Sequence, residues 1–168
     1  MIYGIGIDVL EARRMRATFE RWGERIVERL LLPAERAQFG RTRRPERFLA
    51  MRFAAKEAVV KAMGTGFAHG MWIRDVGIVQ DAWGKPELVW SARGERLRRK
   101  LGIGAGHVTL TDEAGLVVAV AVLLRSGRRT GGGGQRPPVA KQAGTRRTAA
   151  KRARTRPAAA KRAARKRR

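Results

Sequence analysis

The sequence has no cysteine in its 168 residues. This absence excludes disulfides and thiolate-based zinc or redox chemistry, and it fits a reducing compartment. No apolar run approaches the roughly 20 residues that a membrane-spanning helix needs. The chain starts with the strand-like MIYGIGIDV, without a basic region ahead of an apolar one. We therefore expect no signal peptide and a cytoplasmic protein.

Acidic residues are absent from the last quarter of the chain. Residues 127–168 contain 16 Lys and Arg and no Asp or Glu, which accounts for two thirds of the net charge of +24. This segment holds four consecutive glycines (131–134), and Val139 is its only large apolar residue. It can bury too little apolar surface to offset its ordering entropy. The sequence therefore predicts a folded domain over 1–126, with a net charge of +8, and a disordered glycine linker and basic tail over 127–168.

Apolar spacing in the first 126 residues predicts an α+β domain. The strongest helix signal is 47–63, which has no Gly or Pro after its start and ends at Gly64. Further helices are expected over 10–22, from Pro33, and over 92–101; strands are expected over 2–9, 73–79 and 87–90, with a closing hairpin of 107–111 and 116–124.

Asp8 is the first residue with a chemical signal, because it ends an apolar strand. A carboxylate among Ile5, Ile7 and Val9 is costly to bury unless a metal or another cation compensates its charge. An N-cap for a helix that follows explains an Asp at this position equally well. The residues alone leave both explanations open.

The segment RFAAKEAVVKAMGTG (52–66) holds the densest group of charged residues in apolar surroundings. On a helix, Glu57 and Lys61 share a face, and an ion pair on a solvated surface is the simplest explanation. The small and apolar neighbours favour a site for a magnesium phosphate made by Lys56, Glu57, Lys61 and the Gly64–Gly66 turn. Carboxylates ligate this hard cation, lysines contact phosphate oxygens, and a glycine-rich turn exposes N–H groups.

Three segments together resemble a known family. GIGIDVLEARRM (4–15), RFLAMRFAAKEAVVKAMGTG (47–66) and HVTLTDEAGLVVAVAV (107–122) are similar, in order and separation, to the motif regions of the holo-[acyl-carrier-protein] synthases, the small 4′-phosphopantetheinyl transferases. The resemblance covers residues 1–126. It implies their α+β fold, with an antiparallel-rich sheet packed against helices, and a homotrimer with active sites between protomers.

The resemblance also implies an activity. A serine of an acidic apo acyl carrier protein would receive 4′-phosphopantetheine from coenzyme A, with release of adenosine 3′,5′-bisphosphate, in support of fatty acid biosynthesis. The family match makes Asp8 and Glu57 the catalytic residues and the Mg²⁺ ligands. It assigns coenzyme A binding to Lys61, Gly64, Thr65, Gly66 and His107, and carrier-protein binding to Arg14. The proton acceptor stays open among Glu57, a metal-bound water and Glu35.

The basic tail supports a different class of function. Sixteen positive charges without an acid resemble the tails of bacterial histone-like proteins, and they would bind nucleic acid through counterion release. No aromatic residue lies among these charges, so base stacking is not indicated. If nucleic-acid binding were the main task, loss of 127–168 would abolish activity in cells and Asp8→Ala would have no effect. The enzyme interpretation predicts the reverse.

Overall fold

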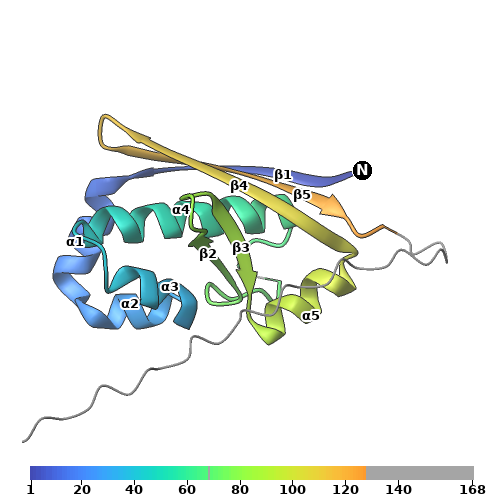
Figure 1. Ribbon diagram of the computed structural model, residues 1–168, viewed down its shortest axis with the longest axis horizontal. Helices are drawn as coiled ribbons and strands as arrows, with labels where there is room; N and C mark the ends of the chain where they lie inside the picture. The colour runs from blue at the N-terminus through green and yellow to red at the C-terminus, as the bar shows by residue number, and fades with distance from the viewer. Residues whose placement is uncertain (68, 128–168) are drawn as a thin grey trace, which may run out of the picture. The chain divides into compact units, whose positions relative to one another are not determined.

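The computed structural model describes residues 1–67 and 69–127 (Figure 1). The expected linker and basic tail therefore lie outside the described residues, except for Gly127. Helices and strands follow one another as β1 (Ile2–Glu11), α1 (Ala12–Trp22), α2 (Glu24–Leu30), α3 (Pro33–Phe39), α4 (Pro45–Met63), β2 (Val76–Gln80), β3 (Pro86–Trp90), α5 (Ala92–Lys100), β4 (Ile103–Glu113) and β5 (Leu116–Arg125).

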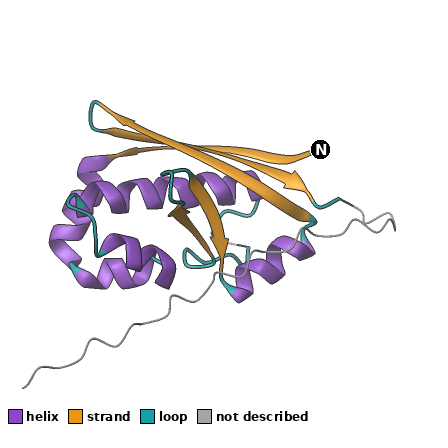
Figure 2. Cartoon of the chain, in the orientation of Figure 1, coloured by secondary structure: helices purple, strands orange, loops and turns teal. Residues whose placement is uncertain are grey.

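The strands form two antiparallel groups (Figure 2). The larger sheet has the order β1-β5-β4, so the C-terminal strand β5 lies between the N-terminal strand and its own hairpin partner. β2 and β3 pair as a separate hairpin. The first and last strands of the described chain therefore become neighbours, and the sheet brings the first and third sequence motifs together.

The central helix α4 lies along β1 and β5 on one side of the sheet (Figure 1). Its inner surface is built from small side chains, of which Ala54, Ala55 and Ala58 are fully buried. Valines and leucines of α4 and β5 fill the remaining space, and each contributes roughly 1.5–3 kcal/mol when removed from water. The core thus lies between this helix and the inward face of the sheet.

The predicted α+β class is confirmed. α4 ends where expected, at Gly64, whose φ of 73° is the left-handed conformation that favours glycine at a helix end. The short helix α2 was not predicted. β2 begins later than expected, because Asp75 first accepts a hydrogen bond from the backbone N–H of Trp72 and closes a turn. Within the described residues, no helix is both long and apolar enough to cross a membrane.

Candidate active site

Two glycines let β1 approach the backbone of α4. A Cβ atom added at Gly6 would lie 2.0 Å from the carbonyl oxygen of Ala58, and one added at Gly4 would lie 2.1 Å from that of Ala62. No other residue type fits at these separations without a backbone shift. The GxG of the first motif is therefore explained by close helix-to-strand contact, and this contact sets the position of Asp8 beside α4.

Asp8 lies on the face of β1 that is turned toward α4. Its neighbours Ile7 and Val9 are exposed on the other face, and its register partner Ala119 is fully buried. Lys61 of α4 donates to Asp8 Oδ1 at 2.7 Å and to the carbonyl oxygen of Ile7 at 3.2 Å. β1 continues to Glu11, so Asp8 is not the N-cap of α1, and that explanation is wrong.

Glu57 is the second carboxylate of this site. Burial raises the pKa of Glu57, the negative charge of Asp8 raises it further, and the Lys61 ammonium opposes both. Because the charge of Asp8 acts on it, Glu57 belongs to the same cluster. The structure therefore brings Asp8 of the first motif beside Glu57 and Lys61, the two residues of the second motif that share one face of α4.

The cluster has the ligand chemistry of a magnesium site. Two carboxylates repel each other, and the nearby Lys61 ammonium compensates only in part. Mg²⁺ is commonly held by one or two carboxylates, with waters and substrate phosphates completing its coordination. Among residues 1–67 and 69–127, no group of three or more His, Asp or Glu side chains could hold a metal ion by itself. Asp8 and Glu57 therefore suit a magnesium ion that is shared with a phosphate-bearing substrate.

Lys56 does not join this cluster, and the expectation that it lies in the phosphate site is wrong. Its side chain is fully buried and points into the core, where Nζ donates to Glu35 Oε2 at 2.8 Å and to the carbonyl oxygens of Leu30 and Ile73. Burial lowers the pKa of Lys56, and the charge of Glu35 opposes this shift.

Glu35 completes this buried pair. It accepts hydrogen bonds from the backbone N–H groups of Leu32 and Ile78, in addition to the one from Lys56. Its carboxylate is 0% exposed. This removes Glu35 from the candidates for a proton acceptor and makes the pair a structural connection between α3, α4 and β2.

The Gly64–Gly66 turn does not expose its backbone N–H groups, contrary to the expectation from its glycines. Its backbone N–H groups all donate to carbonyls of the last turn of α4, with Thr65 and Gly66 both bonded to Val60. They are therefore not free to bind phosphate. The Thr65 hydroxyl is buried and has no hydrogen-bond partner within the described chain.

Comparison with known proteins decides the family. The profile of the 4′-phosphopantetheinyl transferase superfamily matches residues 4–121, which include Asp8, Glu57 and Lys61. The chain belongs to this superfamily. It is 44% identical over 126 residues to the holo-[acyl-carrier-protein] synthase of Thiobacillus denitrificans, a match that covers 75% of this chain and 96% of that protein.

Solved structures of holo-[acyl-carrier-protein] synthases share the fold. The crystal structure from Neisseria meningitidis superposes with a TM-score of 0.71 at 36% identity and covers 74% of this chain and all of that one. The Bacillus anthracis structure, a complex with CoA (3′,5′-ADP), has a TM-score of 0.60 at 33% identity and covers 73% and 96% of the two chains. The chain is therefore a phosphopantetheinyl transferase of the holo-[acyl-carrier-protein] synthase type, and the resemblance seen in its three motifs is confirmed.

In this transferase, His107 lies on the opposite face of the sheet from Asp8. His107 and Ile5 are both paired with Val122, and Ile5 is 57% exposed on the face turned away from α4. His107 lines a hollow of about 330 Å³ together with Lys85 and Arg98. One protomer therefore does not bring His107 to Asp8 and Glu57.

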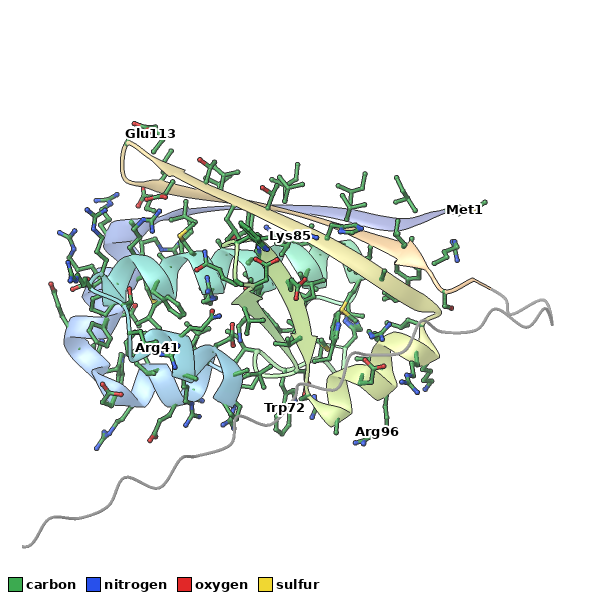
Figure 3. All side chains as sticks on the ribbon, in the orientation of Figure 1. Met1, Arg41, Trp72, Lys85, Arg96 and Glu113 are labelled. Carbon is green, nitrogen blue, oxygen red and sulfur yellow. The ribbon has the colours of Figure 1, made fainter. Side chains whose placement is uncertain are left out.

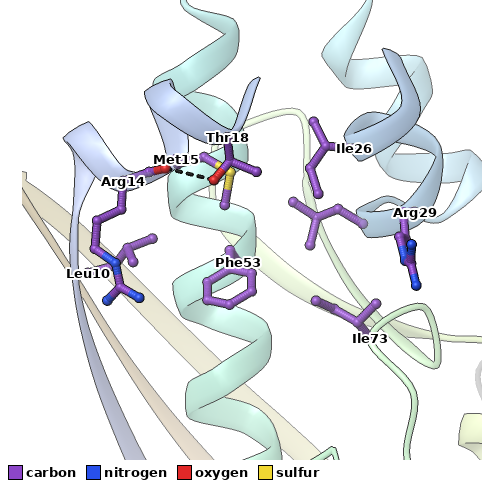
Figure 4. Close-up of a pocket in the computed structure, with 9 residues that line it drawn as sticks. Leu10, Arg14, Met15, Thr18, Ile26, Arg29, Phe53 and Ile73 are labelled. Carbon is purple, nitrogen blue, oxygen red and sulfur yellow. Dashed lines mark hydrogen bonds between the residues drawn. The ribbon is translucent and has the colours of Figure 1, made fainter. Parts of the chain in front are cut away.

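Arg14 of α1 lies at a separate apolar hollow of about 300 Å³ (Figure 4). Phe53 of α4 and Ile73 form one wall of this hollow, and Arg29 of α2 stands across it from Arg14. Arg14 is predicted from the sequence and Arg29 is not, because no sequence signal predicts the helix that carries Arg29. The arrangement is an apolar depression with a guanidinium on either side. We refer to it below as the α1–α2 groove.

Proposed function

We propose that the Asp8–Glu57 site transfers 4′-phosphopantetheine from coenzyme A to a serine of an apo acyl carrier protein and releases adenosine 3′,5′-bisphosphate. The serine hydroxyl forms a new bond to the phosphorus that carries the pantetheine arm, and the bond to the departing nucleotide phosphate breaks. The observation that carries this proposal is the convergence of Asp8, Glu57 and Lys61 in a chain of this family. The reaction would take place in the cytoplasm and support fatty acid biosynthesis.

Asp8 and Glu57 would hold a Mg²⁺ ion. Such an ion neutralises negative charge on phosphate oxygens and on the leaving group of a phosphoryl-type transfer. Support for this assignment comes from the paired carboxylates: burial raises the pKa of Glu57, the negative charge of Asp8 raises it further, and both effects oppose ionisation of Glu57 unless a cation is bound.

Lys61 and Thr65 would bind coenzyme A phosphates beside this ion. Lys61 is half exposed, so its ammonium can exchange contact with Asp8 for contact with a phosphate oxygen. The unpartnered Thr65 hydroxyl lies two residues beyond the end of α4, and a hydroxyl can donate to an acceptor oxygen. Gly64 and Gly66 would shape the turn that presents it, without donating to the ligand themselves.

The serine proton needs an acceptor, for which the sequence leaves Glu57, Glu35 and a metal-bound water open. Glu35 is excluded by its burial and by its three hydrogen bonds. Glu57 and a water on the Mg²⁺ ion remain the candidates for this role.

A homotrimer would complete the site. Ile5, Ile7 and Val9 are each more than half exposed on the face of the sheet that α4 does not cover. A contiguous exposed apolar face of this kind is typical of an interface. Because His107 lies on that same face, a neighbouring protomer can deliver it, with Lys85, to the coenzyme A end of another protomer's site.

The carrier protein would dock on the α1–α2 groove. Arg14 and Arg29 provide positive charge on both sides of an apolar depression, which suits an acidic helix with an apolar side chain at its centre. Arg21, at the end of α1, would add to the attraction on encounter.

The proposed function is tested by the mass of the carrier. The full chain is incubated with apo acyl carrier protein, coenzyme A and Mg²⁺, and intact-mass spectrometry follows the carrier. We expect the addition of one phosphopantetheine, its loss in EDTA, and no addition to a carrier whose acceptor serine is replaced by alanine. An unmodified carrier, across several acidic carriers, would contradict the proposal.

A further inference from the structure

Three arginines from three different segments converge on a third hollow, of about 310 Å³. They are Arg36 of α3, Arg74 of the loop before β2, and Arg93 of α5. Leu32 and Pro33 also line this hollow, and Trp72 stands at its rim. We call it the arginine groove.

Backbone contacts hold two of these side chains in place. Arg36 donates to the carbonyl oxygen of Glu28 at 2.9 Å and to that of Leu31 at 3.3 Å. Arg74 reaches the same Glu28 oxygen at 3.4 Å. Two guanidinium groups therefore meet at one carbonyl oxygen, where their like charges repel each other.

Trp72 and Arg93 form the other wall. The Arg93 guanidinium lies 4.0 Å from the centre of the Trp72 ring and pairs with Asp75 at 3.0 Å. Trp72 is 64% exposed and points away from the main sheet (Figure 3). A large aromatic side chain that stays in solvent beside ordered arginines is typical of the anchor residues of protein interfaces.

The arginine groove carries positive charge that the described chain does not neutralise. Among the ion pairs within the described residues, Asp75 is the only partner of the three arginines, and it pairs with Arg93 alone. Arg36 and Arg74 bind carbonyl oxygens, which do not cancel their charge. The groove therefore suits a surface that supplies carboxylates, which arginine recognises through paired hydrogen bonds.

The arginine groove is continuous along the chain with the α1–α2 groove. Arg29 and Leu30 line the first groove, and the next residues, Leu31 and Leu32, line the second. In the same way Ile73 lines the first groove, while Trp72 and Arg74 on either side of it line the second. The two hollows thus share the same two segments as their common wall.

We propose that the acidic carrier protein contacts both grooves, so that the arginine groove is a second docking surface for the same partner. The inference rests on the proposed function for the identity of that partner. The arginine groove does not include Asp8, Glu57 or Lys61. Its contribution is therefore to the encounter with the carrier and to affinity, and not to the chemical step.

The test measures binding of fluorescently labelled apo acyl carrier protein to the full chain, without coenzyme A, at low and at physiological salt. Arg36→Gln/Arg74→Gln should weaken binding by about tenfold at low salt and reduce its salt dependence. In the transfer assay the same variant should raise KM for the carrier and leave KM for coenzyme A unchanged. Arg74→Gln alone, at an exposed site, should weaken binding less but in the same direction. This single variant tests the groove even if the double variant misfolds.

The matched control is Arg96→Gln/Lys100→Gln, which removes the same charge from exposed positions of α5 that do not line either groove. This control should change binding by less than about twofold. Equal losses in both double variants, or no loss in the first, would overturn the proposal, as would a wild-type chain that does not bind the carrier.

Two further results distinguish carrier docking from nucleic-acid binding, and the docking surface from the proposed activity. If Arg36→Gln/Arg74→Gln weakens binding of a single-stranded oligonucleotide and leaves carrier binding unchanged, the groove binds nucleic acid. That result would overturn the proposal. Carrier binding that depends on the groove, without any mass gain of the carrier, would contradict the proposed function and leave the docking surface supported.

Discussion

Lys61 Nζ lies 2.7 Å from Asp8 Oδ1, so an ammonium on α4 contacts a carboxylate on β1 that is 53 residues away in the sequence. The same ammonium opposes the rise in the pKa of Glu57. The positive charge of Lys61 thus serves two carboxylates at once, which leaves the cluster short of positive charge.

Glu57→Gln should raise the stability of the metal-free protein at pH 7–8. The folded-state pKa of Glu57 is raised above its ordinary value, so the stability that Glu57 contributes is present below its unfolded pKa and is lost as pH rises through the folded pKa. Glu57→Gln should therefore raise the free energy of unfolding at neutral pH and leave it unchanged near pH 4. Thermal unfolding with EDTA across this range measures the difference.

With Mg²⁺ present, the wild type should become more stable than Glu57→Gln. An ion that binds the folded wild type stabilises it according to its affinity, whereas Glu57→Gln loses a ligand and should respond weakly. A variant that is less stable than the wild type at pH 8 without metal would contradict the account of the paired carboxylates.

Gly6→Ala should destabilise the fold and remove activity together. The new Cβ would lie 2.0 Å from the Ala58 carbonyl oxygen, so α4 must move away from β1 and take Glu57 and Lys61 from Asp8. We expect a loss of about 1–3 kcal/mol or more, as for overpacked cores, measured by urea unfolding. Gly40→Ala is the matched control, because its Cβ would meet nothing closer than 3.8 Å and its φ is −61°. A Gly6→Ala protein as stable as this control would rule out the close contact.

Lys56→Met should cost about 3–5 kcal/mol, because it leaves the buried Glu35 carboxylate without its cation. Lys56→Met combined with Glu35→Leu should cost less than the sum of the two single changes, since the double variant leaves neither charge unpaired. Urea unfolding of the four proteins gives the coupling energy. Additive losses would show that the two side chains do not act as a pair.

Most of the fold could be predicted from local sequence, and the reasons differ among elements. α4 carries an uninterrupted helical pattern and a glycine end signal, so its predicted end was correct. α2 has only seven residues and lies between Gly23 and the β-region residue Leu31, a length at which periodicity is weak. The pairing of β1 with β5 joins the two ends of the domain, and no local pattern encodes such a contact.

The site was also predictable only in part, because local motifs name its residues but tertiary packing sets their directions. The family motifs identified Asp8, Glu57 and Lys61, and the structure brings these three together. Sequence could not show that neighbouring residues on α4 have opposite surroundings. Lys56 faces a buried carboxylate that comes from α3, so its direction depends on tertiary packing. The face that carries His107 follows from sheet register, which is also a tertiary property.

Ile7→Lys should convert the protein into inactive monomers without loss of its fold. The Ile7 side chain is 54% exposed on the open face of the sheet, so lysine is tolerated in the protomer and excluded from an apolar interface. Light scattering after size-exclusion chromatography measures the mass, and Ala37→Lys at an exposed position of α3 is the control. If the Ile7→Lys mass equals that of the wild type, the proposed interface is wrong.

His107→Ala and Asp8→Asn should complement each other. If one protomer supplies Asp8 and its neighbour supplies His107, mixed oligomers contain some sites with both residues intact. Co-expressed variants should therefore regain a part of the activity that each lacks alone. Mixed oligomers without any such gain would contradict a site that two protomers share.

The most direct measurement is the rate at which apo acyl carrier protein gains the mass of phosphopantetheine, with coenzyme A and Mg²⁺ saturating. Asp8→Asn and Glu57→Gln should each lower this rate by at least about 100-fold, while both remain folded by circular dichroism. Wild-type rates in either variant would contradict the assignment of Asp8 and Glu57 as the metal-binding centre of the transfer.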